Sequence, residues 1–180
     1  MLLFLLQVFL CQQLHQGFAQ SIPDRLPPLH WPHIIVGQFN PENLNAKVQG
    51  YHSTCLPFPD RSFEIKHELA NGVFLAKWMD KNMGIGREST FFPRSWNCKK
   101  LFDKFTEAYD HILSVRYSPN ESYPDGIVAQ GVTKEGVVIE FVLVHKHHNS
   151  IGNEFIFAPE DGLYVITAYP LLSESVRPSK

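Results

Sequence analysis

The sequence predicts a single α+β domain, in which N-terminal hairpins and one long helix are followed by an antiparallel β-meander. Apolar and polar residues alternate over residues 62–69, as they do in a half-buried strand, and the chain from residue 126 to 169 reads as a succession of short strands and turns. Within 96–115, apolar residues such as Leu101, Phe105 and Ile112 recur at helical spacing. The chain has 180 residues, 44% of them apolar, which is enough to bury one core.

Residues 1–19 have the pattern of a secretory signal peptide. The apolar run Leu2–Leu10 is too short to span a membrane, and Gly17 and Ala19 are the small residues that precede a cleavage site. The stretch lacks the usual Lys or Arg, so a buried N-terminal helix is the alternative. Cleavage after Ala19 would give a secreted, extracellular protein, and we expect no contact with membranes.

A Pro-rich extended leader is expected at residues 20–32, the folded domain at 33–172 and a flexible tail at 173–180. Pro32 is expected to hold Trp31 extended and to exclude a helix running into His33. The polar residues 80–89 are expected to form a loop. The expected strands are 33–39, 47–52, 62–69, 72–79, 126–132, 137–145, 154–158 and 163–169, and the helix is Trp96–Val115 with Ser95 as its N-cap.

The first expected hairpin would bring two histidines together. His33 begins one strand and His52 ends the next, so antiparallel pairing places both imidazoles at one end. Two imidazoles that face a common point can remove one proton and deliver another, as phosphodiester cleavage requires. We assign His33 as general base and His52 as general acid, although the sequence does not distinguish the two roles. A hydrogen-bonded structural histidine is the alternative for each.

Cys55 and Cys98 form a candidate disulfide once Cys11 has left with the signal peptide. The bond would tie the segment after His52 to the start of the helix, and two independent buried thiols are the alternative. Asn120 opens an Asn-Glu-Ser acceptor for N-glycosylation in a Pro-flanked loop, which suits a surface position.

The stretch His145-Lys146-His147-His148 is the one that suggests a metal site. No carboxylate or thiolate nearby completes a tetrahedral set, so we expect an exposed polar turn, no metal and no cofactor. The formal net charge of -2 excludes the broad basic face of a strong non-specific nucleic-acid binder. The remaining histidines, His30, His67 and His111, are expected at the surface or on the helix.

Five blocks occur in a characteristic order along the chain. They are His33-Ile34-Ile35-Val36-Gly37-Gln38, Gly50-Tyr51-His52, Asn71-Gly72-Val73-Phe74, Ser89-Thr90-Phe91-Phe92-Pro93-Arg94-Ser95-Trp96 and Ile166-Thr167-Ala168-Tyr169-Pro170. This succession resembles the EndoU endoribonuclease family, and most closely the compact branch seen as the toxic tail of bacterial secreted proteins. The resemblance covers residues 31–171, and it identifies 33–172 as an EndoU-like nuclease domain.

The resemblance implies a metal-independent cut of single-stranded RNA, near uridine, that leaves a 2′,3′-cyclic phosphate. It implies His33 and His52 as the histidine pair and Thr167 with Tyr169 as a C-terminal hydroxyl pair. On one strand face, these two hydroxyls could hold a phosphate oxygen while the ring stacks on a base. A cross-strand partner and a core-edge ring are the alternatives.

The cationic residue is the point at which the chain departs from the family. A Lys commonly precedes the block that begins here at Ser89, whereas Gly86-Arg87-Glu88 occupies that place. Arg87 is the preferred candidate because a guanidinium grips phosphate oxygens, and Lys77 is the other. Either charge would stabilise a five-coordinate phosphorus, and a solvated surface cation is the alternative. Thr90 is a further candidate for binding phosphate.

The expected partner is single-stranded RNA and the expected state is a monomer, with a protein inhibitor kept open as a second partner. The runner-up function is a catalytically inactive secreted binding module on the same fold. It would hold its partner in the groove or at the glycosylated loop.

Overall fold

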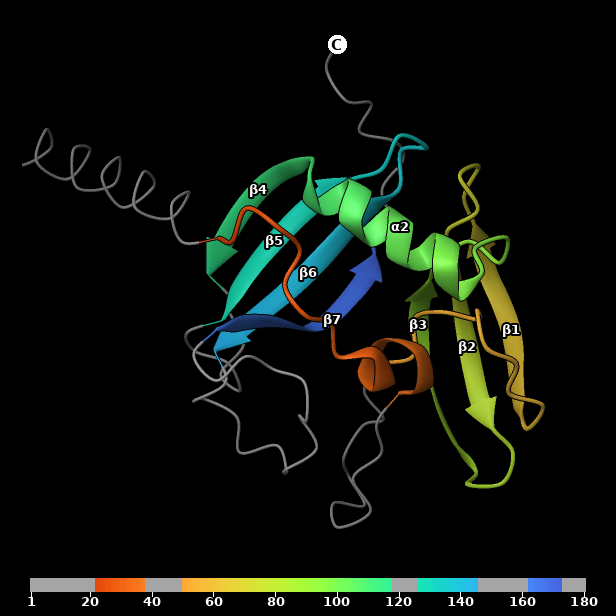
Figure 1. The fold of residues 1–180 in the computed structure, drawn as a ribbon. Coiled ribbons are helices and arrows are strands. Elements are labelled where there is room, and N and C mark those ends of the chain that lie inside the picture. The colour runs from red at the N-terminus through yellow and green to blue at the C-terminus, as the bar shows by residue number, and fades with distance from the viewer. Residues whose placement is uncertain (1–21, 38–49, 118–125, 146–161, 173–180) are drawn as a thin grey trace, which may run out of the picture.

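The computed structural model describes residues 22–37, 50–117, 126–145 and 162–172. In these residues two antiparallel sheets lie side by side, and one α-helix packs across them (Figure 1). The first sheet contains β1 (Arg61–Glu68), β2 (Phe74–Asp80) and β3 (Ile85–Phe91), and the second contains β4 (Ile112–Tyr117), β5 (Ile127–Val132), β6 (Val138–His145) and β7 (Leu163–Pro170). The α+β class and the C-terminal meander are therefore confirmed.

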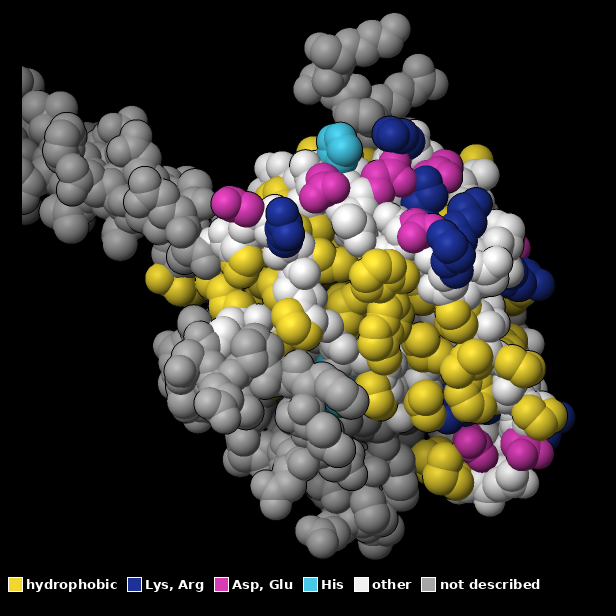
Figure 2. Space-filling view, viewed as in Figure 1, with side chains coloured by type: hydrophobic (Ala, Val, Ile, Leu, Met, Phe, Trp, Pro, Cys, Tyr) yellow, Lys and Arg dark blue, Asp and Glu magenta, His cyan; other side chains and the backbone are white. Residues whose placement is uncertain are grey.

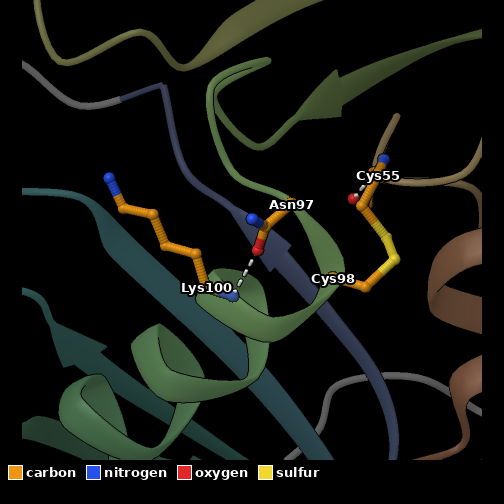
Figure 3. The surroundings of a disulfide bond; sticks show 5 residues. Cys55, Asn97, Cys98 and Lys100 are labelled. Carbon is orange, nitrogen blue, oxygen red and sulfur yellow. Dashed lines mark hydrogen bonds between the residues drawn. A yellow bond between two sulfur atoms is a disulfide. The ribbon is translucent and has the colours of Figure 1, made fainter.

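Helix α2 (Cys98–Tyr109) begins at Asn97, whose side chain accepts a hydrogen bond from the amide of Lys100 at 2.8 Å (Figure 3). Its buried face packs on the second sheet and carries Leu101, Phe105, Ala108 and Tyr109. The helix predicted at Trp96–Val115, with Ser95 as its N-cap, is thus too long at both ends.

The helix ends at Tyr109 because the residues that follow pair with the second sheet instead. The carbonyl of Ala108 accepts from the amide of His111 at 3.1 Å, which closes the turn. Gly131 of β5 lies so close to this turn that a Cβ there would be 1.9 Å from the Ala108 oxygen. Ile112 then pairs with Gly131, and the predicted last turns of the helix form β4 instead.

The predicted first hairpin is wrong in the part that the structure describes. A single-turn π-helix, η1 (Pro32–Val36), replaces the strand, and the amide of Gly37 closes it by donating to the Pro32 carbonyl at 2.9 Å. Proline fits at the first helical position because its missing amide would have no partner there. Residues 50–52 lie outside any strand, and 38–49 lie outside the described residues.

The predicted loop at 80–89 is also wrong, because β3 begins at Ile85 and continues the first sheet. The other strand predictions that fall on described residues are confirmed with shifted ends. The predictions for 1–19, the strand 154–158, the tail 173–180, Asn120, His147 and His148 lie outside the described residues.

The leader pairs with β7 and covers its outer edge. The amide of His30 donates to the carbonyl of Val165, and the amide of Val165 donates to the carbonyl of Pro28, both at 2.9 Å. Leu29 thereby forms a parallel bridge with Val165. An uncovered β7 would expose unpaired backbone groups, so this contact protects the edge and brings η1 beside β7, which also contacts β3 (Figure 1).

Three apolar clusters of the described residues support the two sheets, and the third lies on the face of the second sheet that carries Val128, Val142 and Tyr164. The main core lies between α2 and the second sheet, and includes the Trp31 ring stacked on Phe105 at 5.8 Å between centroids. A smaller aromatic cluster lies on the first sheet and contains Tyr51, Phe74, Ala76, Trp78 and Phe91. On the face drawn in Figure 2, charged side chains gather along α2 and apolar side chains fill the band beside them. In the described part of the chain, no helix has the length and apolarity to cross a bilayer.

Candidate active site

Main-chain hydrogen bonds hold the two histidine-bearing segments together. The amide of Tyr51 donates to the carbonyl of His33 at 2.9 Å, and the amide of His52 donates to the carbonyl of Ile34 at 2.8 Å. The π-helix therefore presents its carbonyls to residues 51 and 52, and the two histidine-bearing segments lie together without the predicted hairpin. Both side chains are largely buried, with 6% of His33 and 8% of His52 exposed.

The corner before His52 requires a glycine. Gly50 has φ +74°, and a Cβ there would lie 1.9 Å from the His33 carbonyl oxygen. Tyr51 follows with φ +64°, a conformation that is uncommon for residues other than glycine. These two residues turn the chain sharply against His33, which sets the direction in which His52 leaves the corner.

The side chain of Tyr51 anchors this strained corner. Its ring is 1% exposed and meets the rings of Trp78 and Phe91 edge-on, with centroids 5.1 and 5.5 Å away. The guanidinium of Arg61 lies 4.1 Å from the ring centroid and also donates to the carbonyl of Val36 at 2.6 Å. Arg61 thus connects the end of η1 to Tyr51, and so supports both histidine segments.

His52 is fixed by β3. Its carbonyl accepts from the amide of Phe92 at 2.9 Å, and its Nδ1 lies 2.9 Å from the carbonyl oxygen of Thr90. Because a carbonyl can only accept, Nδ1 carries the hydrogen and Nε2 has the lone pair in the neutral ring. The sequence pattern predicts Thr90 as a phosphate contact, whereas its main-chain oxygen here sets the tautomer of His52.

Burial lowers the pKa of His52 to about 3, against a smaller upward effect of the hydrogen bond to Thr90. The positive charges of His33 and Arg87 lower it further. The structure thus brings His33 and Arg87 within electrostatic reach of His52, and His52 is neutral at pH 7 when no substrate is bound.

His30 is a third histidine beside the pair. The expectation that it lies on the surface is wrong, because it is 7% exposed and its ring centroid is 6.0 Å from that of His33. Burial, and then the charge of His33, lower its pKa to about 4. His67 is exposed on β1, and His111 is exposed at the end of α2.

The two candidate cations lie on opposite faces of the first sheet. Arg87 is paired with Trp78 and is half-buried, and burial lowers its pKa. Lys77 lies on the exposed face, in register with Glu64 on one side and Glu88 on the other. Of the two, only Arg87 contributes to the electrostatics of His52.

Both C-terminal candidates, Thr167 and Tyr169, lie on β7, and Tyr169 lies beside His52. The ring centroid of Tyr169 is 5.4 Å from that of His52, with the planes tilted by 36°. The Tyr169 hydroxyl, however, donates to a carboxylate oxygen of Glu140 on β6. The hydroxyl of Thr167 is buried and has no hydrogen-bond partner among the described residues.

The predicted disulfide is confirmed between Cys55 and Cys98, whose Cα atoms are 5.0 Å apart (Figure 3). Cys98 is the first residue of α2, and Cys55 follows His52 by one short turn in which its amide donates to the Ser53 hydroxyl at 3.1 Å. The bond therefore ties the His52 segment to the helix. Within the described ranges, no three His, Cys, Asp or Glu side chains gather as metal ligands.

Sequence reasoning missed three residues that shape the site. Gly50 acts through its backbone conformation, and Arg61 acts through its long side chain. Neither property can be recognised from the neighbouring residues in the sequence. Glu140 could have been found, because it is a lone acid in the apolar run Val137–Val144 and a buried carboxylate requires partners.

Comparison with known proteins agrees with the resemblance. Residues 31–172 match the family model described as bacterial EndoU nuclease. A curated protein named "Toxin" from Bacillus cereus is 27% identical over 127 residues, which cover 67% of this chain and 21% of that protein. This chain therefore spans about a fifth of the length of the curated relative that it matches. No solved structure matches. The match over most of the chain shows that the protein belongs to the bacterial EndoU nuclease family.

Proposed function

We propose that this protein is a secreted endoribonuclease that cleaves single-stranded RNA near uridine. The ribose 2′-hydroxyl attacks the adjacent phosphorus, the bond to the 5′-oxygen breaks, and a 2′,3′-cyclic phosphate and a free 5′-hydroxyl result. Membership of a nuclease family supports this activity. The observation that carries the proposal is the pair of backbone hydrogen bonds that holds the His52 segment against η1, with the charge of Arg87 within reach.

The histidines have distinct roles in this reaction, and the roles are the reverse of the assignment from sequence. His52 is the general base, because its Nε2 has the lone pair and burial keeps the ring neutral. It takes the proton of the 2′-hydroxyl, and His33 as the imidazolium gives its proton to the leaving 5′-oxygen. The phosphate of the bound RNA would stabilise the charged form of His33.

Arg87 stabilises the negative charge that develops on the five-coordinate phosphorus. Its place on the inner face of β3 supports this role, and the flanking glutamates argue against Lys77. A fixed cation in a nearly dry site is worth several kcal/mol to such a transition state, on the order of 3 kcal/mol. The hydroxyl of Thr167 is the proposed contact to a non-bridging phosphate oxygen, and its lack of a hydrogen-bond partner among the described residues supports this role.

The partner of the site is an unpaired RNA segment. A net charge of -2 supports local binding of one or a few nucleotides rather than wrapping of a duplex. The relative named as a toxin supports a secreted protein, consistent with the signal-peptide pattern of residues 1–19, and makes a protein inhibitor a reasonable second partner. We propose a monomer with its nuclease domain at residues 33–172 and a glycan at Asn120.

The proposal is tested with DNA oligonucleotides that contain a single ribonucleotide, incubated with the protein in EDTA. Cleavage is expected only at the ribonucleotide, fastest for uridine, and mass spectrometry is expected to find a cyclic phosphate end. The matched oligonucleotide with 2′-deoxyuridine lacks the nucleophile and must stay intact. If every ribonucleotide also stays intact at high protein concentration, the nuclease proposal fails and the inactive binding module is favoured.

A further inference from the structure

A buried carboxylate lies directly behind the candidate site, on β6. Glu140 is 5% exposed and receives three hydrogen bonds. Its Oε1 accepts from the hydroxyl of Tyr169, and its Oε2 accepts from Gln130 at 2.7 Å and from Arg116 at 3.0 Å. A buried carboxylate is costly unless it is paired, and here each carboxylate oxygen has at least one donor.

The register of the second sheet aligns these residues into one row. Gln130 of β5 lies opposite Glu140 of β6, and Glu140 lies opposite Tyr169 of β7. Ser114 of β4 lies opposite Gln130 and donates to its side-chain oxygen at 3.3 Å. The row thus crosses all four strands of the meander, and it ends at the Tyr169 ring.

The end of the row meets the histidine that we propose as the base. The ring of Tyr169 lies 5.4 Å from the ring of His52, which Thr90 holds from the other side through Nδ1. Because the hydroxyl proton of Tyr169 is committed to Glu140, it is not available to a phosphate oxygen. What Tyr169 presents to the site is the face of its ring.

We infer that Glu140 is a positioning residue for this site, which holds the Tyr169 ring against His52 by accepting its hydroxyl proton. Gln130 and Arg116 keep the carboxylate oriented toward β7. The inference rests on the proposed nuclease function, and it reassigns Tyr169 from a hydroxyl that contacts phosphate to a ring that forms the wall of the site. Glu140 acts on the reaction only through Tyr169.

The test is a double-mutant cycle on the full-length chain, with its disulfide intact, using the uridine-containing oligonucleotide. Glu140→Gln keeps the size of the side chain, and its one remaining oxygen is required by the donors Gln130 and Arg116, so that the amide NH2 group faces Tyr169 and cannot accept its proton. Tyr169→Phe removes only the hydroxyl. Each is expected to lower kcat about tenfold with little change in KM, because a misplaced group costs rate rather than binding. The double variant is expected to be no slower than either single variant, because both remove the same contact.

Three further variants separate positioning from a structural role. Tyr169→Leu removes the ring and is expected to lose about tenfold more activity than Tyr169→Phe. Glu64→Gln, on the exposed edge strand β1, is the matched control and is expected to retain wild-type kcat. If Glu140→Gln does not fold, Arg116→Gln breaks one of its two contacts on Oε2 and is expected to lower kcat in the same direction.

A spectroscopic measurement tests the geometry without catalysis. The imidazole proton resonances of His52 lie within the ring current of Tyr169, so Glu140→Gln is expected to shift them, and Glu64→Gln is not. Wild-type protein that leaves the RNA intact would refute the proposed function. Active wild-type protein combined with an unchanged kcat in Glu140→Gln, or with losses that multiply in the double variant, would refute the role of Glu140 alone.

Discussion

The amide of Tyr51 donates to the carbonyl of His33, and this main-chain bond, together with the one from His52 to Ile34, joins two segments whose histidines are far apart in the sequence. It forms because Gly50 and Tyr51 both have positive φ and turn the chain onto the end of the π-helix. The geometry of the candidate site is therefore a property of the backbone around residues 50–52.

Replacing Gly50 by Ala tests this backbone. The new Cβ would lie 1.9 Å from the His33 oxygen, so the two segments must separate, and the cleavage rate is expected to fall at least about 100-fold. Gly84→Ala is the matched control, because Gly84 also has positive φ (+64°) but nothing lies within 4 Å of a Cβ there. Both variants carry a backbone cost of about 1–2 kcal/mol, but only Gly50→Ala is expected to lose activity. Equal activity in the two variants would contradict the account.

The identity of the cation is tested by comparing Arg87→Met with Lys77→Met. Removing the guanidinium that acts on His52 is expected to lower kcat about 100-fold, the usual effect of losing one group that stabilises transition-state charge. Lys77 lies between two glutamates on the exposed face, and its loss is expected to change kcat by less than about threefold. The reverse order of effects would identify Lys77 as the cation.

The stability of the fold is expected to fall on acidification because of His52 and His30. Burial lowers their folded-state pKa values to about 3 and about 4, whereas an unfolded histidine titrates near 6.5. Below pH 6.5 the unfolded chain binds protons that the folded chain does not. The contribution of these two neutral histidines to the free energy of unfolding is therefore complete above pH 6.5, and it is lost as the pH falls toward 3. Urea unfolding at pH 7.5 and 4.5 measures the loss.

His52→Gln is expected to lose less stability between these two pH values than the wild-type protein does. His67→Gln, on the exposed strand β1, is the control and is expected to match the wild type. A wild-type pH dependence in His52→Gln would show that burial of this ring does not govern the acid sensitivity.

The disulfide is expected to stabilise the site as well as the fold. It closes a loop between residues separated by 43 positions, which corresponds to about 3–4 kcal/mol in the chain-entropy account. A Cys55→Ser, Cys98→Ser double variant is expected to lose that amount in urea unfolding and to cleave RNA more slowly at 37 °C. A Cys98→Ser variant as stable as the wild type would exclude this role.

Much of the fold could be predicted from the sequence because its strands are short runs of β-branched and aromatic residues bounded by turn residues, and its helix has one apolar face. The meander and the start of the helix are within a few residues of the prediction. The end of the helix differs from the prediction, because Ile112 and Val115 fit both the apolar stripe of a helix and the pattern of a strand. Only the pairing of β4 with β5 decides between helix and strand for these residues.

The sequence predicts that the segments of His33 and His52 lie together, but through a hairpin, whereas the structure has the π-helix η1 at His33. Ile34, Ile35 and Val36 favour a strand locally, and the π-helix wins because its carbonyls bond to residues distant in the sequence. The sequence favours Arg87 over Lys77 only through the chemistry of its guanidinium, and the position of each cation relative to the histidines could not be predicted. It depends on the strand face on which each lies, and β3 was expected to be a loop.

The central claim is that His33 and His52 form one acid–base pair, and single-turnover cleavage of the uridine-containing oligonucleotide in EDTA measures it most directly. His33→Ala and His52→Ala are each expected to lower the rate about 1,000-fold or more, with no further loss in the double variant, while the exposed His67→Ala keeps the wild-type rate. If either single variant cleaves within about tenfold of the wild type, the two histidines are not the catalytic pair.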